Sequence, residues 1–196
     1  MHQQTSSDSR RDSILRAAQT LVIDHGADAV TMSQLAAQTG LSRPAVYQYF
    51  ASSSHVLAEL VLDDMADLTN DLERLLGKIS DPRERVRAWI HYSVAYLATG
   101  EHQAVMTISR SALPEDTIGV IRAMHGLLME QLSTPLEQLG VSSGPSLAGL
   151  IYAAVAAAAE RIANGADALE QTNLLEVFVD AGLNETLGNE TGLSSK

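Results

Sequence analysis

The chain has 196 residues, which is enough for one moderate domain or for a small domain joined to a larger one. Hydrophobic residues make up 45% of the sequence, so it can bury a sizeable core, while a formal net charge of −11 argues against non-specific coating of DNA and against an anionic membrane as partner. The absence of cysteine excludes disulfides, thiolate metal sites and cysteine nucleophiles, and no apolar run approaches the roughly 18 residues of a membrane span.

The pattern of apolar residues predicts an all-α chain of about nine helices, because no segment keeps the period-two alternation of a strand. In chain order, the first helix ends at Gly26, and residues 31–50 hold two short helices. A long apolar stripe then runs from Val56 to near Gly77. The remaining helices are expected over residues 82–100, 101–112, 115–140, 146–164 and 168–182, with residues 1–7 and 184–196 left polar and mobile.

Residues 31–50, TMSQLAAQTGLSRPAVYQYF, carry the most specific pattern in the chain. Thr31 can cap one helix, with Gln34 as its capping-box partner, and Ser42 can cap the next helix. Gly40 supplies the turn between them, where a positive φ is easily reached by glycine. Pro44 fits the first turn of the second helix, whose N–H groups have no partner inside the helix. This geometry is that of a helix-turn-helix or of an ordinary corner between two bundle helices.

The spacing of small residues and the character of the exposed ones favour the helix-turn-helix. Ala36, Gly40 and Val46 stand at the distances that this motif requires. A purely structural corner has no use for exposed basic, amide and aromatic side chains. In this segment those side chains are Arg43, Tyr47, Gln48 and Tyr49.

The helix that stops at Gly26, the helix-turn-helix, the aromatic segment YQYF and the helix after it together resemble the TetR family of transcriptional regulators over about residues 8–68. The resemblance implies a three-helix DNA-binding domain at 8–68, with its helix-turn-helix at 31–50. It further implies a helical effector-binding and dimerisation domain at 69–183 and a polar tail at 184–196. The implied function is that of a ligand-responsive homodimeric repressor, without a cofactor, that binds two palindromic half-sites of double-stranded DNA.

The resemblance also assigns DNA contacts to the helix starts and to the recognition helix. Arg43 is placed to read guanine or to bind a phosphate, and Gln48 is able to read adenine. The expected contact residues are Thr31, Ser42, Arg43, Pro44, Ala45, Tyr47, Gln48, Tyr49 and Ser53. At Ser53 the family usually has a lysine that holds the DNA backbone, so we expect this chain to lack about one phosphate contact.

The negative charge of the chain does not belong to the expected DNA-binding region. Residues 1–54 contain four basic and four acidic residues, whereas residues 55–196 contain nine basic and twenty acidic ones. Phosphate binding depends on local charge, so the acidic remainder does not exclude DNA as a partner. Arg10 and Arg11 are either an arm that compensates for Ser53 or simply solvated side chains.

Two further groups of residues are expected in the second domain. An aromatic stripe at helical spacing is either one wall of a ligand pocket or ordinary core. The expected pocket residues are Trp89, Tyr92, Tyr96, Met106, Met124 and His125. The expected dimer interface, whose alternative is packing within one chain, consists of Leu147, Ile151, Ala154, Ala158, Ile162, Leu175, Phe178 and Val179. A two-fold partner is favoured because a single recognition helix reads too few bases for tight binding.

Two other functional classes stay open. A helical ligand-binding or scaffold protein with a weakened DNA-binding head would account for Ser53 and for the low basic charge. An enzyme on a helical bundle has no support, because no Gly-x-Ser-x-Gly, phosphate-loop or paired-carboxylate motif occurs. The histidines lack metal-ligand spacing, and the polar N-terminus carries no signal-peptide pattern, which predicts a cytoplasmic location.

Overall fold

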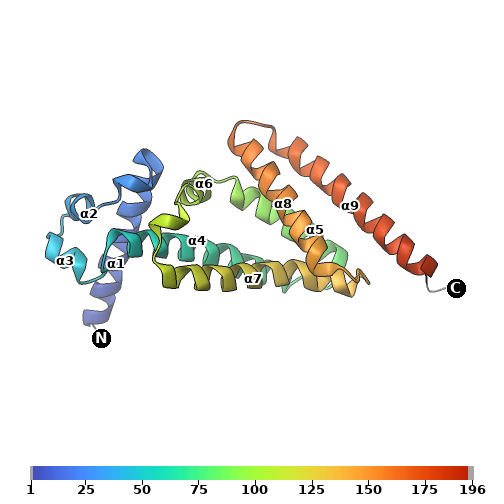
Figure 1. Ribbon diagram of the computed structural model, residues 1–196, viewed down its shortest axis with the longest axis horizontal. Helices are drawn as coiled ribbons and strands as arrows, with labels where there is room; N and C mark the ends of the chain where they lie inside the picture. Colours follow the sequence, from blue (N-terminus) through green and yellow to red (C-terminus); the bar gives the residue numbers. More distant parts are fainter. Residues whose placement is uncertain (1, 194–196) are drawn as a thin grey trace. The chain divides into compact units, whose positions relative to one another are not determined.

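The computed structural model consists of helices joined by short turns and loops (Figure 1). It describes the backbone of residues 2–193 and the side chains of residues 9–185 and 187. Within that range the α-helices are α1 (His2–His25), α2 (Met32–Thr39), α3 (Arg43–Tyr47), α4 (Ser53–Leu76), α5 (Pro82–Leu97), α6 (Gly100–Met106), α7 (Glu115–Gln138), α8 (Gly144–Ala163) and α9 (Ala168–Leu193). Two short 3-10 helices, η1 (Ala27–Ala29) and η2 (Arg110–Ala112), lie between them. Nine α-helices, with no strand in the described backbone, confirm the predicted all-α class.

The predicted end of the last helix near Gly182 is wrong. Helix α9 continues to Leu193 and takes in most of the expected polar tail at 184–196. A glycine ends a helix readily when it adopts a left-handed conformation. The glycines with positive φ in the described backbone are Gly26, Gly40, Gly140 and Gly165, so Gly182 does not interrupt the helix. Residues 1 and 194–196, for which mobility was expected, lie outside the described residues.

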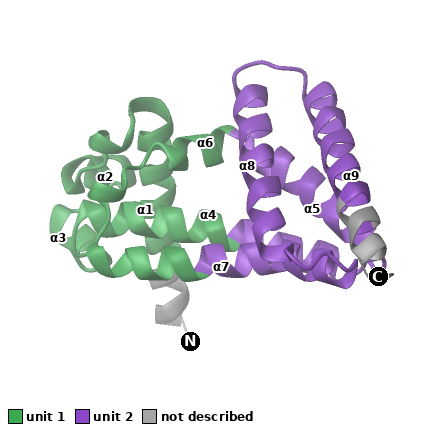
Figure 2. Cartoon of the chain, turned by 45° about the vertical axis from the view of Figure 1, so that its right-hand side comes forward, with its two compact units in different colours: residues 1–66, 100–123 green, residues 67–99, 124–196 purple. Residues whose placement is uncertain are grey.

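The chain divides into two compact units, coloured separately in Figure 2. Unit 1 comprises Met1–Ala66 and Gly100–Ala123, and unit 2 comprises Asp67–Thr99 and Met124–Lys196. The segment 100–123, which the sequence assigned to the second domain, therefore packs with the first. Apolar burial explains the difference, because Val105 and Ile108 are buried in the core of unit 1.

The core of unit 1 joins the N-terminal helices to the start of α4. Ile14, Leu35, Val46 and Val56 come from α1, α2, α3 and α4, and all four are fully buried. Burying an aliphatic side chain of this size stabilises the fold by about 1.5–3 kcal/mol. Helix α3 has only five residues, too few to be stable alone, so this shared core is what fixes its position.

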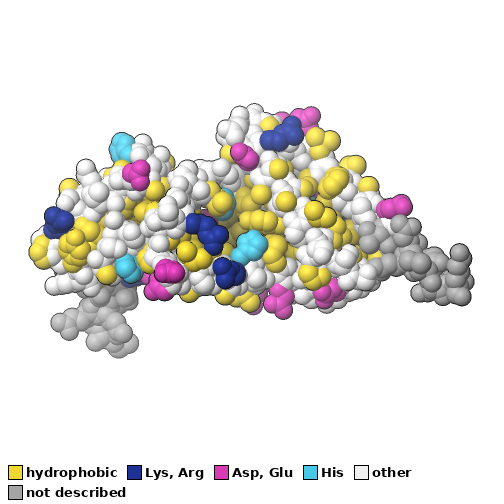
Figure 3. All heavy atoms as spheres, in the orientation of Figure 1, with side chains coloured by type: hydrophobic (Ala, Val, Ile, Leu, Met, Phe, Trp, Pro, Cys, Tyr) yellow, Lys and Arg dark blue, Asp and Glu magenta, His cyan; other side chains and the backbone are white. Residues whose placement is uncertain are grey.

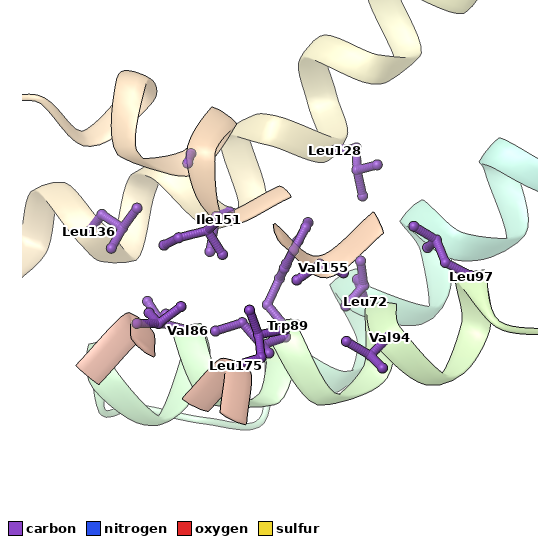
Figure 4. Close-up of a cluster of buried hydrophobic side chains, with 14 of the residues drawn as sticks. Leu72, Val86, Trp89, Val94, Leu97, Leu128, Leu136, Ile151, Val155 and Leu175 are labelled. Carbon is purple, nitrogen blue, oxygen red and sulfur yellow. The ribbon is translucent and has the colours of Figure 1, made fainter. Parts of the chain in front are cut away.

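The core of unit 2 forms around α5, which packs against both α8 and α9. Figure 4 shows Trp89 at its centre, with Ile151 and Val155 of α8 and Leu175 of α9 close to it. The indole ring of Trp89 also meets the ring of Tyr152 edge-on, with 6.5 Å between centroids. Leucines of α4 and α7 complete the cluster, which therefore joins five helices.

Charged side chains connect the outer surfaces of α5 and α9. Asp180 accepts hydrogen bonds from Arg83 at 3.2 Å and from Arg87 at 2.7 Å. One turn earlier on α9, Glu176 lies 2.6 Å from the Nε2 atom of His91. These pairs are partly exposed, so each contributes little stability, but together they fix which side of α9 faces α5.

Candidate nucleic-acid interface

The two helices of residues 31–50 begin and end where the sequence predicts. Thr31 Oγ1 accepts a hydrogen bond from the backbone N–H of Gln34 at 3.2 Å, and this contact caps α2. Ser42 Oγ accepts one from the N–H of Ala45 at 3.3 Å and caps α3. Gly40 adopts φ of 68°, a left-handed conformation that a side chain would strain. The turn is therefore fixed by local chemistry.

Packing then determines which side of α3 is free. Ala36 and Val46 are buried between the helices, and Phe50 is buried directly after α3. The opposite side is left to solvent. The exposed members of the expected DNA-contact set are Thr31, Ser42, Arg43, Pro44, Tyr47 and Gln48, and the half-buried members are Ala45, Tyr49 and Ser53.

The guanidinium group of Arg43 lies over the ring of Tyr47, 5.9 Å from its centroid. A cation in this position is attracted by the ring, which restricts the rotamers of both exposed side chains. Both residues belong to α3, so the contact holds the basic group against the exposed surface of this helix. A partly ordered guanidinium loses less entropy when it binds a base edge or a phosphate.

Ser52 caps the start of α4, since its hydroxyl oxygen accepts a hydrogen bond from the backbone N–H of His55 at 3.4 Å. The same hydroxyl lies 2.8 Å from the Nδ1 atom of His55. His55 is exposed in the first turn, two residues after Ser53, and is a candidate contact that sequence reasoning missed. The available signal was an imidazole within one turn of the helix start, where anions bind.

Arg11 is held within unit 1 and is not the solvated arm that the sequence allowed. Its guanidinium lies 2.8 Å from a carboxylate oxygen of Glu59 and 5.6 Å from the ring centroid of Phe50. The hydrogen bond to Glu59 raises the pKa of Arg11 above its usual value. Arg11 therefore fastens α1 to α4, while Arg10 stays exposed.

The expected pocket residues fall into two groups. Met106 belongs to unit 1 and is exposed, whereas Trp89, Tyr92, Tyr96, Met124 and His125 belong to unit 2. Trp89 is fully buried, and its Nε1 atom has no hydrogen-bond partner among the described residues. Tyr92 stacks on Tyr96 at 6.3 Å and donates its hydroxyl proton to Asp71. No member of the set lines the unit 2 cavity of about 520 Å³ between α4 and α7.

The contact between Tyr92 and Asp71 predicts a late tyrosine titration. Burial, then the hydrogen bond to Asp71, raises the pKa of Tyr92 from 10.0 to about 12. In an ultraviolet titration we expect Tyr92→Phe to remove a transition near pH 12 that remains in Tyr47→Phe. Because the unfolded chain would release this proton first, the free energy of unfolding should fall as pH rises above 10. A Tyr92→Phe protein that keeps the late transition would contradict the contact.

Half of the expected dimer interface lies inside the protomer. Ile151, Ala158, Leu175 and Val179 are buried in the core of unit 2, so these assignments are wrong. Leu147, Ala154 and Ile162 are half-buried against the same core. The physical reason is that α8 is apolar on most sides, so its sequence alone does not reveal which side faces inward.

Phe178 is the member of the expected set that remains on the surface, with 66% of it exposed. Further apolar residues of α8 and α9 are exposed with it, namely Leu150, Leu169, Leu174 and Val177. Along α9, Leu174, Val177 and Phe178 follow helical spacing and form one stripe. Figure 3 shows hydrophobic side chains gathered at the surface over α8 and α9.

A short capped helix, held by a tight turn and exposing polar and aromatic side chains, defines a helix-turn-helix domain. Residues 14–60 match the family described as bacterial regulatory proteins, tetR family. The HTH-type transcriptional regulator BetI from Agrobacterium fabrum is 34% identical over 84 residues, which are 43% of this chain and 41% of that protein. The N-terminal helices thus match the TetR family, and the chain spans about two fifths of the length of the first curated relatives it matches.

Solved structures extend the likeness of fold over nearly the whole chain. A transcriptional regulator from Saccharomonospora viridis in complex with choline has a TM-score of 0.75 at 18% identity, covering 89% of this chain and 96% of that one. FadR from Bacillus subtilis in complex with stearoyl-CoA has a TM-score of 0.69 at 18% identity, covering 83% of this chain and 94% of that one. At these identities the comparison establishes the fold and no more.

Proposed function

We propose that this protein is a sequence-specific DNA-binding transcriptional regulator that acts as a ligand-responsive homodimeric repressor. The observation that carries the proposal is the capped α3, which exposes Arg43, Tyr47 and Gln48 while its other side is buried. A helix of this kind enters the major groove, where base edges present distinct patterns of donors and acceptors. The names of the curated relatives, which are transcriptional regulators, support the same function.

Replacing Arg43 by alanine tests the proposal most directly. We expect Arg43→Ala to lose about 1–3 kcal/mol of specific binding, because a bidentate contact to guanine is lost. The melting temperature should stay unchanged, since Arg43 is exposed. Affinity for DNA selected from a fragment pool is the measurement, and Arg122→Ala, an exposed arginine on α7, is the matched control. Equal affinities of the two variants would count against base readout by Arg43.

Adding a charge at the start of α4 should strengthen binding without changing its specificity. Ser53→Lys supplies a cation beside the helix start, and a phosphate contact carries no sequence information. We expect tighter binding to every DNA sequence and a salt dependence steeper by about one phosphate. Ser146→Lys, at an exposed position at the start of α8, is the control for net charge. Parallel salt slopes for the two variants would remove Ser53 from the DNA interface.

The exposed apolar stripe supports a second copy of the chain as partner. Leu150 of α8 and Leu174, Val177 and Phe178 of α9 are all more than half exposed. Contiguous apolar surface of this kind on a soluble protein marks an interaction site. A two-fold contact through α8 and α9 buries it and supplies two recognition helices for two half-sites.

The effector is proposed to bind in unit 2. Choline and stearoyl-CoA occupy two solved structures that share this fold, which supports a small-molecule effector without identifying it. An effector that binds the DNA-free form more tightly than the DNA-bound form weakens DNA binding. The ratio of its two affinities sets how much the affinity for DNA falls. The test is whether a candidate molecule lowers affinity for the selected DNA.

The proposed regulator is cytoplasmic and has no catalytic activity. Helix α8 is long and apolar enough to cross a membrane by length and composition. Five of its residues are buried in the unit 2 core, and its exposed Leu150 is proposed to contact the partner copy. Among the described residues no group of three or more potential metal ligands occurs.

A scaffold or ligand-binding protein with a weakened DNA-binding head is the second candidate. Two observations favour it: Ser53 stands where the family usually has a lysine, and Arg11 is held by Glu59. Capture of DNA from a genomic fragment pool separates the two candidates, since only the regulator enriches particular sequences.

A further inference from the structure

His55, at the start of α4, lines a cavity of about 200 Å³ within unit 1. Its walls come from α1, from the segment between α3 and α4, from the first half of α4 and from the start of α7. The lining residues are Arg11, Tyr49, Phe50, Ala51, His55, Ala58, Glu59, Leu62 and Thr117. Tyr49 and Phe50 follow α3 closely in the chain, so the cavity borders the helix that is proposed to enter the major groove.

The charges in this lining cancel, apart from that of His55. The guanidinium of Arg11 lies 2.8 Å from a carboxylate oxygen of Glu59, and the two groups form one neutral pair. Asp12 and Asp63 also act on Arg11, but both are exposed and neither lines the cavity. Exposed charges outside the cavity are screened by salt, so the protonation of His55 decides the sign of the lining.

The polar groups that reach the cavity from other elements do not change charge near neutral pH. From α7, the buried Thr117 contributes a hydroxyl that donates to the exposed carboxylate of Asp116 at 3.4 Å. Tyr49, from the segment before α4, contributes a half-buried phenol. Among side chains, histidine is the one that ordinarily gains or loses its charge between pH 5 and 8. His55 is therefore the group that makes this lining cationic as pH falls.

The imidazole ring of His55 is oriented by Ser52. The hydroxyl oxygen of Ser52 accepts from the backbone N–H of His55 at 3.4 Å and lies 2.8 Å from Nδ1 of the ring. This contact engages Nδ1 and leaves Nε2, on the far side of an exposed side chain, with no hydrogen-bond partner among the described residues. In the protonated ring both nitrogens are donors, so Nδ1–H donates to Ser52 and Nε2–H is free to donate to an anion.

We propose that protonated His55 donates from Nε2 to a phosphate of the DNA backbone, and that DNA binding therefore tightens as pH falls from 8 to 6. This contact rests on the proposed function, since it needs DNA beside α3. Phosphate favours the charged form of the ring, so binding takes up a proton, and by linkage a lower pH favours binding. Arg11 is a positioning residue, because its pair with Glu59 stops that carboxylate, one turn along α4, from holding the imidazolium instead.

Equilibrium DNA binding at two pH values tests the contact. The probes are the DNA selected from the fragment pool and a duplex of unrelated sequence, each titrated at pH 8 and at pH 6 over a range of salt concentrations. For each bound protomer, we expect the lower pH to tighten binding about two- to fivefold, the value of one exposed ion pair, and to steepen the slope of log affinity against log salt by about 0.9. His55→Gln should lose both changes. A His55→Gln protein with the pH dependence of the parent would overturn the proposal.

Matched variants separate the imidazole from other effects. His55→Gln keeps the backbone N–H that donates to Ser52, so its melting temperature should equal that of the parent. His25→Gln removes an exposed imidazole at the end of α1, about 21 Å along the helix from Arg11 at 1.5 Å per residue, and should bind as the parent does. His55→Lys carries its charge at both pH values, so it should bind tightly at both. Equal pH dependence in His55→Lys and the parent would contradict the role of the imidazole charge.

The positioning role of Arg11 is tested by rescue. Arg11→Gln leaves the carboxylate of Glu59 without its partner, so we expect weaker DNA binding and a smaller pH dependence than in the parent. Adding Glu59→Gln removes that carboxylate and should restore both properties, which a merely structural loss would not allow. A double variant that binds as weakly as Arg11→Gln alone would overturn the positioning role, because Arg11 would then act on DNA directly.

Calorimetry identifies the source of the phosphate and counts the protons. Titration with the unrelated duplex at pH 7, in two buffers of different ionisation enthalpy, should show proton uptake by the parent that is reduced in His55→Gln. Inorganic phosphate that binds at pH 6 without changing DNA affinity would assign the cavity to a free anion and overturn the proposal. Enrichment of particular DNA sequences with equal proton uptake in the parent and His55→Gln would overturn the His55 contact alone. Absence of binding to either DNA at both pH values would overturn the proposed function and the contact together.

Discussion

Phe178→Asp should convert the proposed dimer into a folded monomer that has lost specific DNA binding. The side chain is 66% exposed in the protomer, so an aspartate there costs the monomer little. In a two-fold contact the substitution occurs twice and places two carboxylates in apolar surroundings without partners. A monomer presents one recognition helix, and its affinity should fall toward the non-specific range of roughly 10⁻⁴–10⁻⁶ M.

Sedimentation and DNA titration of the same sample check this expectation. Asn70→Asp adds the same charge at an exposed position on α4, outside the proposed contact of α8 and α9. It should remain dimeric and bind as the parent does. A dimeric Phe178→Asp protein with normal affinity would place the interface on another surface.

Ala158→Arg should unfold unit 2 rather than separate two copies. Ala158 is only 8% exposed and lies in the core formed by α5, α8 and α9. An arginine there either buries an unpaired charge or forces the helices apart, and we expect a loss of at least about 3 kcal/mol in the free energy of unfolding. For a chain of this length that lowers the melting temperature by roughly 6 °C or more.

Ala163→Arg provides the comparison on the same helix. Ala163 is exposed and lies on a different side of α8 from Leu150, so its variant should keep the secondary structure and the cooperativity of the parent. Thermal unfolding at several protein concentrations is the measurement, because the stability of a dimer depends on concentration. Ala158→Arg and Ala163→Arg proteins of equal stability would contradict the assignment of α8's buried side.

The DNA-binding head could be predicted from the sequence because short-range chemistry determines it. Thr31 and Ser42 cap helices through N–H groups three residues away, and Gly40 turns the chain by itself. Each of these caps and turns involves residues within one helical turn of each other, so a few consecutive residues of the sequence are enough to predict it.

The inward side of α8 could not be predicted in this way. Leu150 and Ile151 are neighbours of equal hydrophobicity, yet the first is exposed and the second buried. A helix with alanine, leucine and isoleucine on most sides gives no contrast for periodicity to detect. The ion pair of Arg11 and Glu59 forms only because α1 and α4 pack together in the folded chain. The periodicity of apolar residues in the sequence does not show this contact.

Helix α9 has acidic side chains on the side that faces α5 and exposed apolar side chains on another side. Glu176 and Asp180 are committed to α5 of the same chain, while Val177 and Phe178 are open. A cell that contains several related regulators needs each copy to assemble with its own kind, and shape or charge that excludes the wrong partner achieves this. In this chain, substitutions confined to the exposed surface of α9 around Val177 and Phe178 can change which partner is accepted. Paralogues can therefore diverge in whom they pair with while the bundle inside each chain stays the same.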